Sequence, residues 1–155
     1  MNKLVRLGMA ALLVTTMLSL AQAQERKLKR AQLPPAVEKT VAEQSQGATI
    51  VGFASEVEKG RRLYEAELKV NGLSKDILID KDGNIVEVEA EVPMDSLPSA
   101  VREGLKKAAG RRTIVKVESL TKNGTLVAYE AVVKAGAKRS EIQVGPDGEK
   151  LIHKQ

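Results

Sequence analysis

Residues 64–72 read Tyr-Glu-Ala-Glu-Leu-Lys-Val-Asn-Gly, and a related stretch, Tyr-Glu-Ala-Val-Val-Lys-Ala-Gly-Ala, follows at residues 129–137. In the first copy Tyr64, Ala66 and Leu68 alternate with charged residues. This alternation is typical of a strand with one face in a core and the other in water. The flanks of the stretch repeat as well, so the sequence predicts two copies of one small unit.

The N-terminus has the three regions of a secretory signal peptide. Lys3 and Arg6 give the first region its positive charge. An apolar run extends from Leu7 to Leu20, and Ala21-Gln22-Ala23 forms a small-residue cleavage site. A membrane anchor, the alternative, needs roughly 20 apolar residues, and this run is shorter and contains two threonines and a serine. We therefore expect cleavage after residue 23, no stable membrane anchor, and a periplasmic or secreted protein.

The exported chain has no cysteine, so its stability depends on packing without disulfides. Its charged residues are distributed unevenly along the sequence. Residues 24–32 carry four basic and one acidic residue and predict a flexible basic leader. Residues 33–96 carry 7 basic and 13 acidic residues, a net charge of −6, whereas residues 97–155 carry 12 basic and 6 acidic, a net charge of +6. Opposite charges favour association of the two copies side by side. Independent drift of two solvated surfaces is the alternative explanation.

Each copy begins with a predicted helix. Leu33-Pro34-Pro35-Ala36-Val37 and Leu97-Pro98-Ser99-Ala100-Val101 place proline in the first turn, where it loses no hydrogen bond. Gly47 and Gly110 mark the two helix ends. Helices of this length are marginal in water on their own, so they must pack on the strands that follow.

Four strands are predicted after each helix. The first begins at Thr-Ile-Val, the second contains Tyr-Glu-Ala, and an Asp-Gly turn, a strong hairpin signal, separates the third from the fourth. The third strands cover residues 77–79 and 142–144, and the fourth cover residues 86–92 and the short copy 151–153.

These elements predict an α+β fold in which a helix packed on a four-stranded antiparallel sheet, αββββ, occurs twice, at residues 33–96 and 97–155. A unit of roughly 60 residues buries only about 60% of its chain surface and is marginal alone. We therefore expect the two sheets to lie side by side or share an edge, leaving one broad strand face exposed. In the first repeat that face carries Glu65, Glu67, Glu87, Glu89 and Glu91.

No catalytic residue is predicted, and we expect the protein not to be an enzyme. His153 is the only histidine and lies near the chain end, and there is no cysteine nucleophile. The alternating residues Glu87, Glu89 and Glu91 look evenly solvated, and the second repeat has no similar series. General acids need unequal surroundings, so we interpret these glutamates as a solvated face or a charged patch for a partner.

No metal or cofactor site is predicted either. Asp80-Lys81-Asp82-Gly83-Asn84 resembles a calcium loop, but its glycine is the fourth residue and not the sixth. The second repeat keeps only Asp147-Gly148 of this pattern, so a turn explains it better.

Binding of nucleic acid is not expected. The basic cluster at the end of the second helix complements the helix dipole; it consists of Lys106, Lys107, Arg111 and Arg112. The exported chain has only three aromatic residues, Phe53, Tyr64 and Tyr129, and so offers no platform for base stacking.

The repeated order of Leu-Pro-x-Ala-Val, Thr-Ile-Val, Tyr-Glu-Ala and Asp-Gly resembles the PepSY-like family, in particular its tandem beta-lactamase-inhibitor-like members. The resemblance covers about residues 33–92 and 97–153. It implies an exported, non-catalytic α+β module; PepSY relatives in peptidase propeptides resemble inhibitors or folding aids. The inhibitor-like fold uses a concave sheet rich in aromatic contacts, which this chain lacks, so no site residues carry over.

The sequence thus favours a periplasmic module that binds a protein partner through its open sheet face. An exported enzyme is a candidate partner. A structural or envelope-stress protein that binds a small ligand or ion is the alternative.

Overall fold

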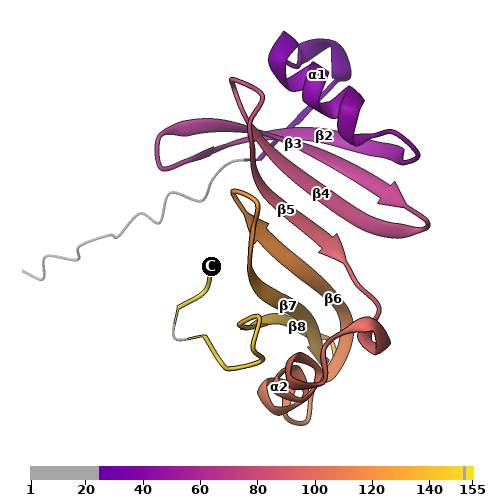
Figure 1. The fold of residues 1–155 in the computed structure, drawn as a ribbon, viewed down its shortest axis with the longest axis vertical. Coiled ribbons are helices and arrows are strands. Elements are labelled where there is room, and N and C mark those ends of the chain that lie inside the picture. Colours follow the sequence, from indigo (N-terminus) through magenta and orange to yellow (C-terminus); the bar gives the residue numbers. More distant parts are fainter. Residues whose placement is uncertain (1–24, 152) are drawn as a thin grey trace, which may run out of the picture.

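The strands of this protein form one eight-stranded antiparallel sheet in the computed structural model, which describes residues 25–151 and 153–155 (Figure 1). The strands lie in chain order, so each pairs with the next. They are β1 (Arg26–Leu28), β2 (Thr49–Glu58), β3 (Arg61–Val70), β4 (Leu73–Asp80), β5 (Ile85–Glu91), β6 (Thr113–Lys122), β7 (Thr125–Ala135) and β8 (Lys138–Val144). The helices are α1 (Pro35–Gln44) and α2 (Ser99–Ala109), with short 3-10 turns η1 (Arg30–Gln32) and η2 (Met94–Ser96).

The first repeat consists of α1 and β2–β5, as predicted. Pro35 occupies the first helical turn, and Val37 and Val41 of α1 are fully buried. They form a core with apolar residues that alternate along the strands, namely Phe53, Ala66, Leu68, Ile77 and Ile79. This core confirms the prediction that Tyr64, Ala66 and Leu68 of the Tyr-Glu-Ala strand point to the interior.

The second repeat builds an equivalent core from α2 and β6–β8. The helix ends at Gly110, whose φ of 61° suits glycine. Its buried residues Val101, Leu105 and Ala109 pack on four strand residues, Val117, Ala131, Val133 and Val144.

The predicted fourth strand of the second repeat, residues 151–153, is wrong. Beyond β8 the described residues add only an isolated bridge between Val144 and Lys150. In the first repeat the corresponding stretch is seven residues, β5, in which apolar and charged side chains alternate. Residues 149–153, Glu-Lys-Leu-Ile-His, do not alternate in this way. Among the described residues, the layout is therefore β1, then αββββ, then αβββ.

The predicted flexible leader, residues 24–32, forms a strand and a 3-10 turn in its described part, residues 25–32. Arg26–Leu28 forms β1 and pairs with β2. Arg30 donates three hydrogen bonds to the carboxylate of Glu38 in α1, the shortest at 2.7 Å. Leu28 packs against the first core, which explains why this short strand covers the edge of β2. The predicted signal peptide, residues 1–23, lies outside the described residues. Within the described chain, no helix has the length and apolar character needed to cross a membrane.

The two repeats share an edge, as one of the two predicted arrangements required. β5 pairs with β6 from Glu87↔Lys122 to Glu91↔Glu118, which makes the two half-sheets continuous. Lys122 Nζ lies 3.0 Å from Glu87 Oε2, so one ion pair joins the acidic repeat to the basic one.

A candidate binding surface on the open face of the sheet

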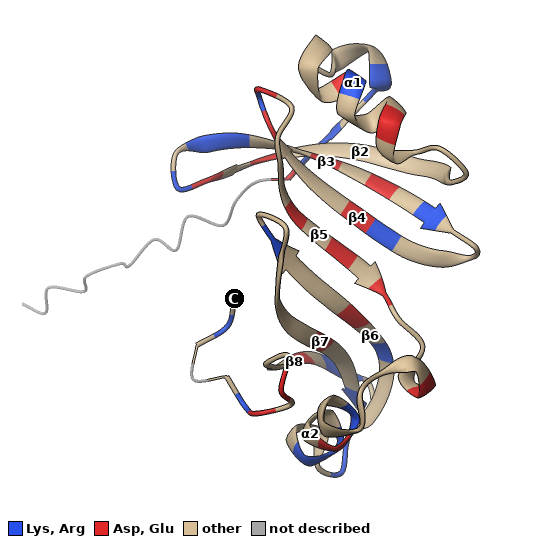
Figure 2. Cartoon of the chain, viewed as in Figure 1, with Lys and Arg blue, Asp and Glu red and all other residues tan. Residues whose placement is uncertain are grey.

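The two helices pack on one face of the sheet, and we call the other side the open face. Ala66, Ile77 and Val117 point into the helix-covered cores. Because successive strand residues point to opposite faces, their neighbours lie on the open face. Its carboxylates include Glu65, Glu67, Asp76, Glu87, Glu89, Glu91, Glu118 and Glu130. Figure 2 shows acidic residues on successive strands from β3 to β6.

Several of these carboxylates stand directly opposite one another on adjacent strands. Asp76 is paired with Glu67 on one side and with Glu89 on the other. Glu118 is similarly placed between Glu91 and Glu130. Like charges directly opposite each other destabilise a sheet, so this face holds an electrostatically unfavourable arrangement.

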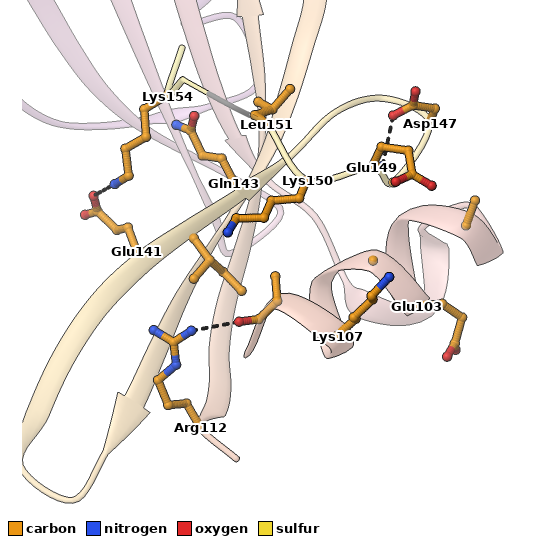
Figure 3. A pocket seen from close by; sticks show the side chains of 15 residues that line it. Glu103, Lys107, Arg112, Glu141, Gln143, Asp147, Glu149, Lys150, Leu151 and Lys154 are labelled. Carbon is orange, nitrogen blue, oxygen red and sulfur yellow. Dashed lines mark hydrogen bonds and ion pairs between the residues drawn. The ribbon is translucent and has the colours of Figure 1, made fainter. Parts of the chain in front are cut away.

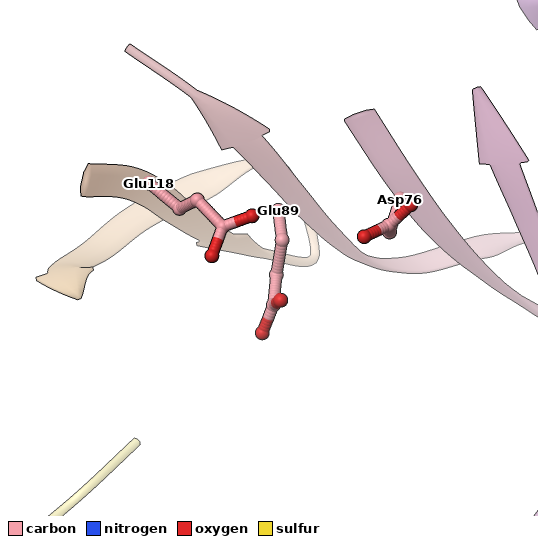
Figure 4. A group of neighbouring side chains, drawn as sticks. All are labelled: Asp76, Glu89 and Glu118. Carbon is pink, nitrogen blue, oxygen red and sulfur yellow. The ribbon is translucent and has the colours of Figure 1, made fainter. Parts of the chain in front are cut away.

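The closest group of carboxylates crosses the boundary between the repeats. Oxygen atoms of Asp76 (β4), Glu89 (β5) and Glu118 (β6) all lie within 4.8 Å of one another (Figure 4). Glu118 is the most buried of the three, with 5% of its surface exposed, and Lys116 Nζ lies 2.7 Å from its Oε1. The group therefore needs both repeats, because Asp76 and Glu89 come from the first and Glu118 from the second.

A cavity of about 270 Å³ lies beside this group on the open face. Its ionisable lining is entirely acidic, and Ile77 and Leu78 complete it. The acidic residues are Glu25, Glu56, Glu65, Asp76, Glu87 and Glu89. Such a lining suits a cationic group rather than an anion.

The pKa values on the open face depart from the even solvation that the alternating pattern suggested. Burial, with Asp76 nearby, raises the pKa of Glu65 to about 7. Burial, with Glu118 nearby, likewise raises the pKa of Glu89 to about 7. In contrast, the pKa of Glu91 is lowered, because the backbone N–H and hydroxyl of Ser74 each donate to its Oε2 at 3.0 Å. The expectation of a uniformly solvated glutamate series is therefore wrong.

Few cations neutralise this surface. Of the eight carboxylates named above, two have an ion-pair partner among the described residues, Glu118 with Lys116 and Glu87 with Lys122. Both lysines belong to β6. Most of the carboxylates thus have no ion-pair partner within the described chain.

Sequence reasoning placed the five glutamates of the first repeat on one face, and the structure brings them together there. It missed Asp76, and it treated the second repeat as having no similar series, although Glu118 and Glu130 continue the surface. Their alternation with Ile77, Val117 and Ala131 was the available signal, because each acidic residue adjoins a core residue.

The remaining candidates from the sequence lie elsewhere. His153 is exposed near the C-terminus. Asp80 Oδ1 accepts hydrogen bonds of 2.9 Å from the backbone N–H groups of Asp82 and Asn84, which confirms that this segment is built as a turn. Arg112 donates to the last carbonyls of α2, at 2.7 Å to Ala108 and 3.0 Å to Ala109, as a cation at a helix C-terminus should.

Three solved structures show the same fold at low sequence identity. A BLIP-like protein from Bacteroides fragilis is 23% identical, with a TM-score of 0.57 over 77% of this chain and 83% of that one. A protein from Bacteroides eggerthii described as periplasmic is 19% identical, with a TM-score of 0.63 over 77% and 86%. A DUF2874 family protein from Bacteroides ovatus is also 19% identical, with a TM-score of 0.61 over 77% and 84%.

A sequence comparison with curated proteins found no match. A family model, by contrast, matches residues 20–87 and again residues 63–149, which together span most of the chain. The first match includes α1 and the second includes α2, and the two overlap at residues 63–87. The chain belongs to the PepSY-like family described as beta-lactamase-inhibitor-like.

Proposed function

We propose that this protein is a periplasmic or secreted, non-catalytic binding module whose open face accepts a basic segment of a protein partner. The observation that carries this proposal is the carboxylate surface of the open face, on which burial raises the pKa of Glu65 and Glu89 to about 7. Within the described residues, Glu65 and Glu89 lose solvation without gaining an ion-pair partner.

A lysine or arginine from a partner would supply the missing counter-charge. Placing a cation beside a desolvated carboxylate favours its ionised form and removes part of the repulsion between opposite strands. Charge complementarity of this kind sets association rate and partner choice more than raw affinity. The partner we expect therefore presents a basic segment rather than an aromatic anchor.

The compartment is supported by two independent observations. The N-terminal residues 1–23 have the charge, apolar and cleavage regions of a signal peptide. The structural relative from Bacteroides eggerthii is described as periplasmic, and the relative from Bacteroides fragilis as BLIP-like. An inhibitor-like role toward an exported protein is consistent with both.

Capture from the periplasmic extract of the native host tests this function. Immobilised protein should retain a stoichiometric partner at low salt and lose part of it at moderate salt, because screening weakens charge pairing. A triple variant, Glu65→Gln, Glu89→Gln and Glu130→Gln, should retain far less of it.

The matched control removes the same charge from exposed sites away from the open face, through Glu43→Gln, Asp82→Asn and Asp95→Asn. It should capture the partner as the wild type does. Equal capture by the open-face variant, or no stoichiometric partner at either salt concentration, would contradict the proposal.

Binding of a small cation is the second candidate function, favoured by the carboxylate oxygens of Asp76, Glu89 and Glu118 that lie within 4.8 Å of one another. Hard divalent cations such as Ca²⁺ prefer oxygen ligands of this type. Native mass spectrometry of protein purified from its own host separates the two functions. A bound metal mass that disappears in Glu89→Gln supports cation binding, whereas an unmodified mass leaves protein binding as the function.

A further inference from the structure

We infer that the outer edge of β8 and the groove beneath α2 bind an extended segment of a partner protein, which adds to the sheet as a ninth strand and alternates apolar with acidic residues. This surface is distinct from the carboxylates of the open face.

Comparison of the two repeats indicates what belongs in the groove. In the first repeat β4 lies between β3 and β5, and β5 contributes Ile85 and Val88 to the first core. In the second repeat the equivalent strand, β8, pairs with β7 alone, apart from the Val144–Lys150 bridge within the described chain. No strand of the described residues fills the corresponding place beside β8. The end of the chain touches β8 there through that bridge, through the Lys154–Glu141 ion pair, and through a hydrogen bond from the Gln155 N–H to Gln143.

A groove of about 740 Å³ occupies this place, between α2 and β8 (Figure 3). Its lining includes Ala100, Gly104 and Ala108 from α2 and Ile142 from β8. Ala108 and Ile142 also pack against the second core, so apolar side chains of an added strand would extend that core as Ile85 and Val88 do in the first repeat.

The charges around the groove favour an acidic strand. Lys107 and Lys150 line it and make no side-chain hydrogen bond or ion pair within the described residues. Of the four acidic lining residues, Glu103 pairs with Lys106 and Glu141 with Lys154, whereas Asp147 accepts only the backbone N–H of Glu149 and Glu149 has no ion pair within the described residues. The groove thus offers two unpaired ammonium groups to an incoming carboxylate.

The edge itself points to the same chemistry. Lys138 and Arg139 begin β8 and are exposed. Basic residues on an edge strand discourage pairing with another copy of the same edge, but they attract an acidic segment. Strand addition to a free edge is a recurrent mode of peptide recognition, with backbone hydrogen bonds for affinity and alternate side chains for specificity.

A synthetic peptide that copies residues 84–92, the segment containing β5, is the probe. Its sequence, Asn-Ile-Val-Glu-Val-Glu-Ala-Glu-Val, alternates apolar and acidic residues. Added to the exported protein, it should slow amide hydrogen exchange in residues 139–143 by about tenfold or more at saturation. A peptide in which lysine replaces all three glutamates should bind at least about tenfold more weakly.

Charge reversal in the groove tests the assignment directly. The double variant Lys107→Glu and Lys150→Glu should weaken peptide binding about tenfold. Lys39→Glu with Lys59→Glu changes the net charge equally at exposed sites outside the groove and should leave binding unchanged. The open-face variant with Glu65, Glu89 and Glu130 replaced by glutamine should bind the peptide normally, so the two proposals fail separately. No slowing of exchange in β8, equal binding of the lysine peptide, or equal loss in both double variants would overturn the inference.

Discussion

Glu89 illustrates how a residue acquires properties that its place in a strand pattern does not reveal. It alternates with Val88 and Ala90 like any surface residue of an antiparallel strand. Its neighbours across the sheet are Asp76 on β4 and, diagonally, Glu118 on β6. Burial and these like charges together favour its protonated form.

This shift gives the protein an unusual dependence of stability on pH. The pKa of Glu89 is raised from 4.5 to about 7 in the folded state, so the folded protein holds this proton more tightly than the unfolded chain. The free energy of unfolding should therefore fall as pH rises from about 4.5 to about 7 and level off above that. Glu65 contributes in the same direction.

Replacement Glu89→Gln should remove part of this dependence. At about pH 8 the variant should be more stable than the wild type by about 1 kcal/mol, a figure reduced from the full shift because the side chain retains solvent contact. Urea unfolding at about pH 5 and about pH 8 measures it. Glu43→Gln, on the exposed face of α1, is the control and should change neither value. A wild type that becomes more stable toward pH 8 would contradict the pKa assignment.

At this scale the sequence was sufficient to predict which face the glutamates occupy but not their environment. The face to which each glutamate points follows from the two-residue period of a strand. Desolvation depends on residues brought in by other strands, such as Asp76 and Glu118, whose register is not written in the spacing of Glu87, Glu89 and Glu91. The same applies to Glu91, which Ser74 stabilises from β4.

The two Asp-Gly turns reverse the chain and also contact the helices. Gly83 has a φ of 89°, and Gly148 a φ of 84°. Each turn also packs on the helix of its own repeat: a Cβ at Gly83 would stand 2.8 Å from the Ala36 carbonyl oxygen, and a Cβ at Gly148 would overlap that of Ala100. The hydroxyl of Thr40 in α1 donates to the Gly83 carbonyl at 2.6 Å.

Replacing Gly83 with alanine should therefore cost more than backbone strain alone. We expect Gly83→Ala to lower the free energy of unfolding by about 2–4 kcal/mol, the sum of a left-handed backbone penalty and overlap with α1. Gly124→Ala is the matched control, because its φ is 78° and no heavy atom lies within 4 Å of the added Cβ. It should cost about 1 kcal/mol. Equal losses in chemical denaturation would show that the contact with the helix adds nothing.

Most elements followed from local sequence signals, and the two errors have physical causes. Helix entry at proline, helix end at Gly110 and the hairpin glycines are decided within a few residues. The leader becomes β1 because Leu28 reaches the first core, a long-range contact. Asp147-Gly148 repeats the turn of the first repeat, but the residues after it lack the alternation of β5. The hairpin signal alone therefore led to a strand being predicted where none forms in the described residues.

For the molecule as a whole, the β5–β6 junction decides both stability and the binding surface. The first repeat alone, residues 25–96, would expose the edge of β5 and lose the Glu87–Lys122 ion pair. We expect it to unfold at a much lower denaturant concentration than the full chain, because a unit of this size is marginal. Urea titration followed by circular dichroism measures both midpoints, and equal midpoints would show that the repeats are independent.

The duplicated architecture and the family were predictable from the repeated motifs, since each copy specifies its own helix and strands. The junction was predictable only as one of two arrangements, side by side or sharing an edge. The pairing of Glu91 with Glu118 depends on which residues of β5 and β6 meet, and no motif in either repeat specifies that register.

Our central claim is that the carboxylates of both repeats form one coupled surface across this junction. A ¹³C NMR titration of the side-chain carboxyl groups tests it most directly, in the wild type and in Glu118→Gln. We predict that Glu89 titrates near pH 7 and that its pKa falls when the negative charge of Glu118, in the other repeat, is removed. A Glu89 pKa near 4.5, or one that Glu118→Gln leaves unchanged, would contradict the claim.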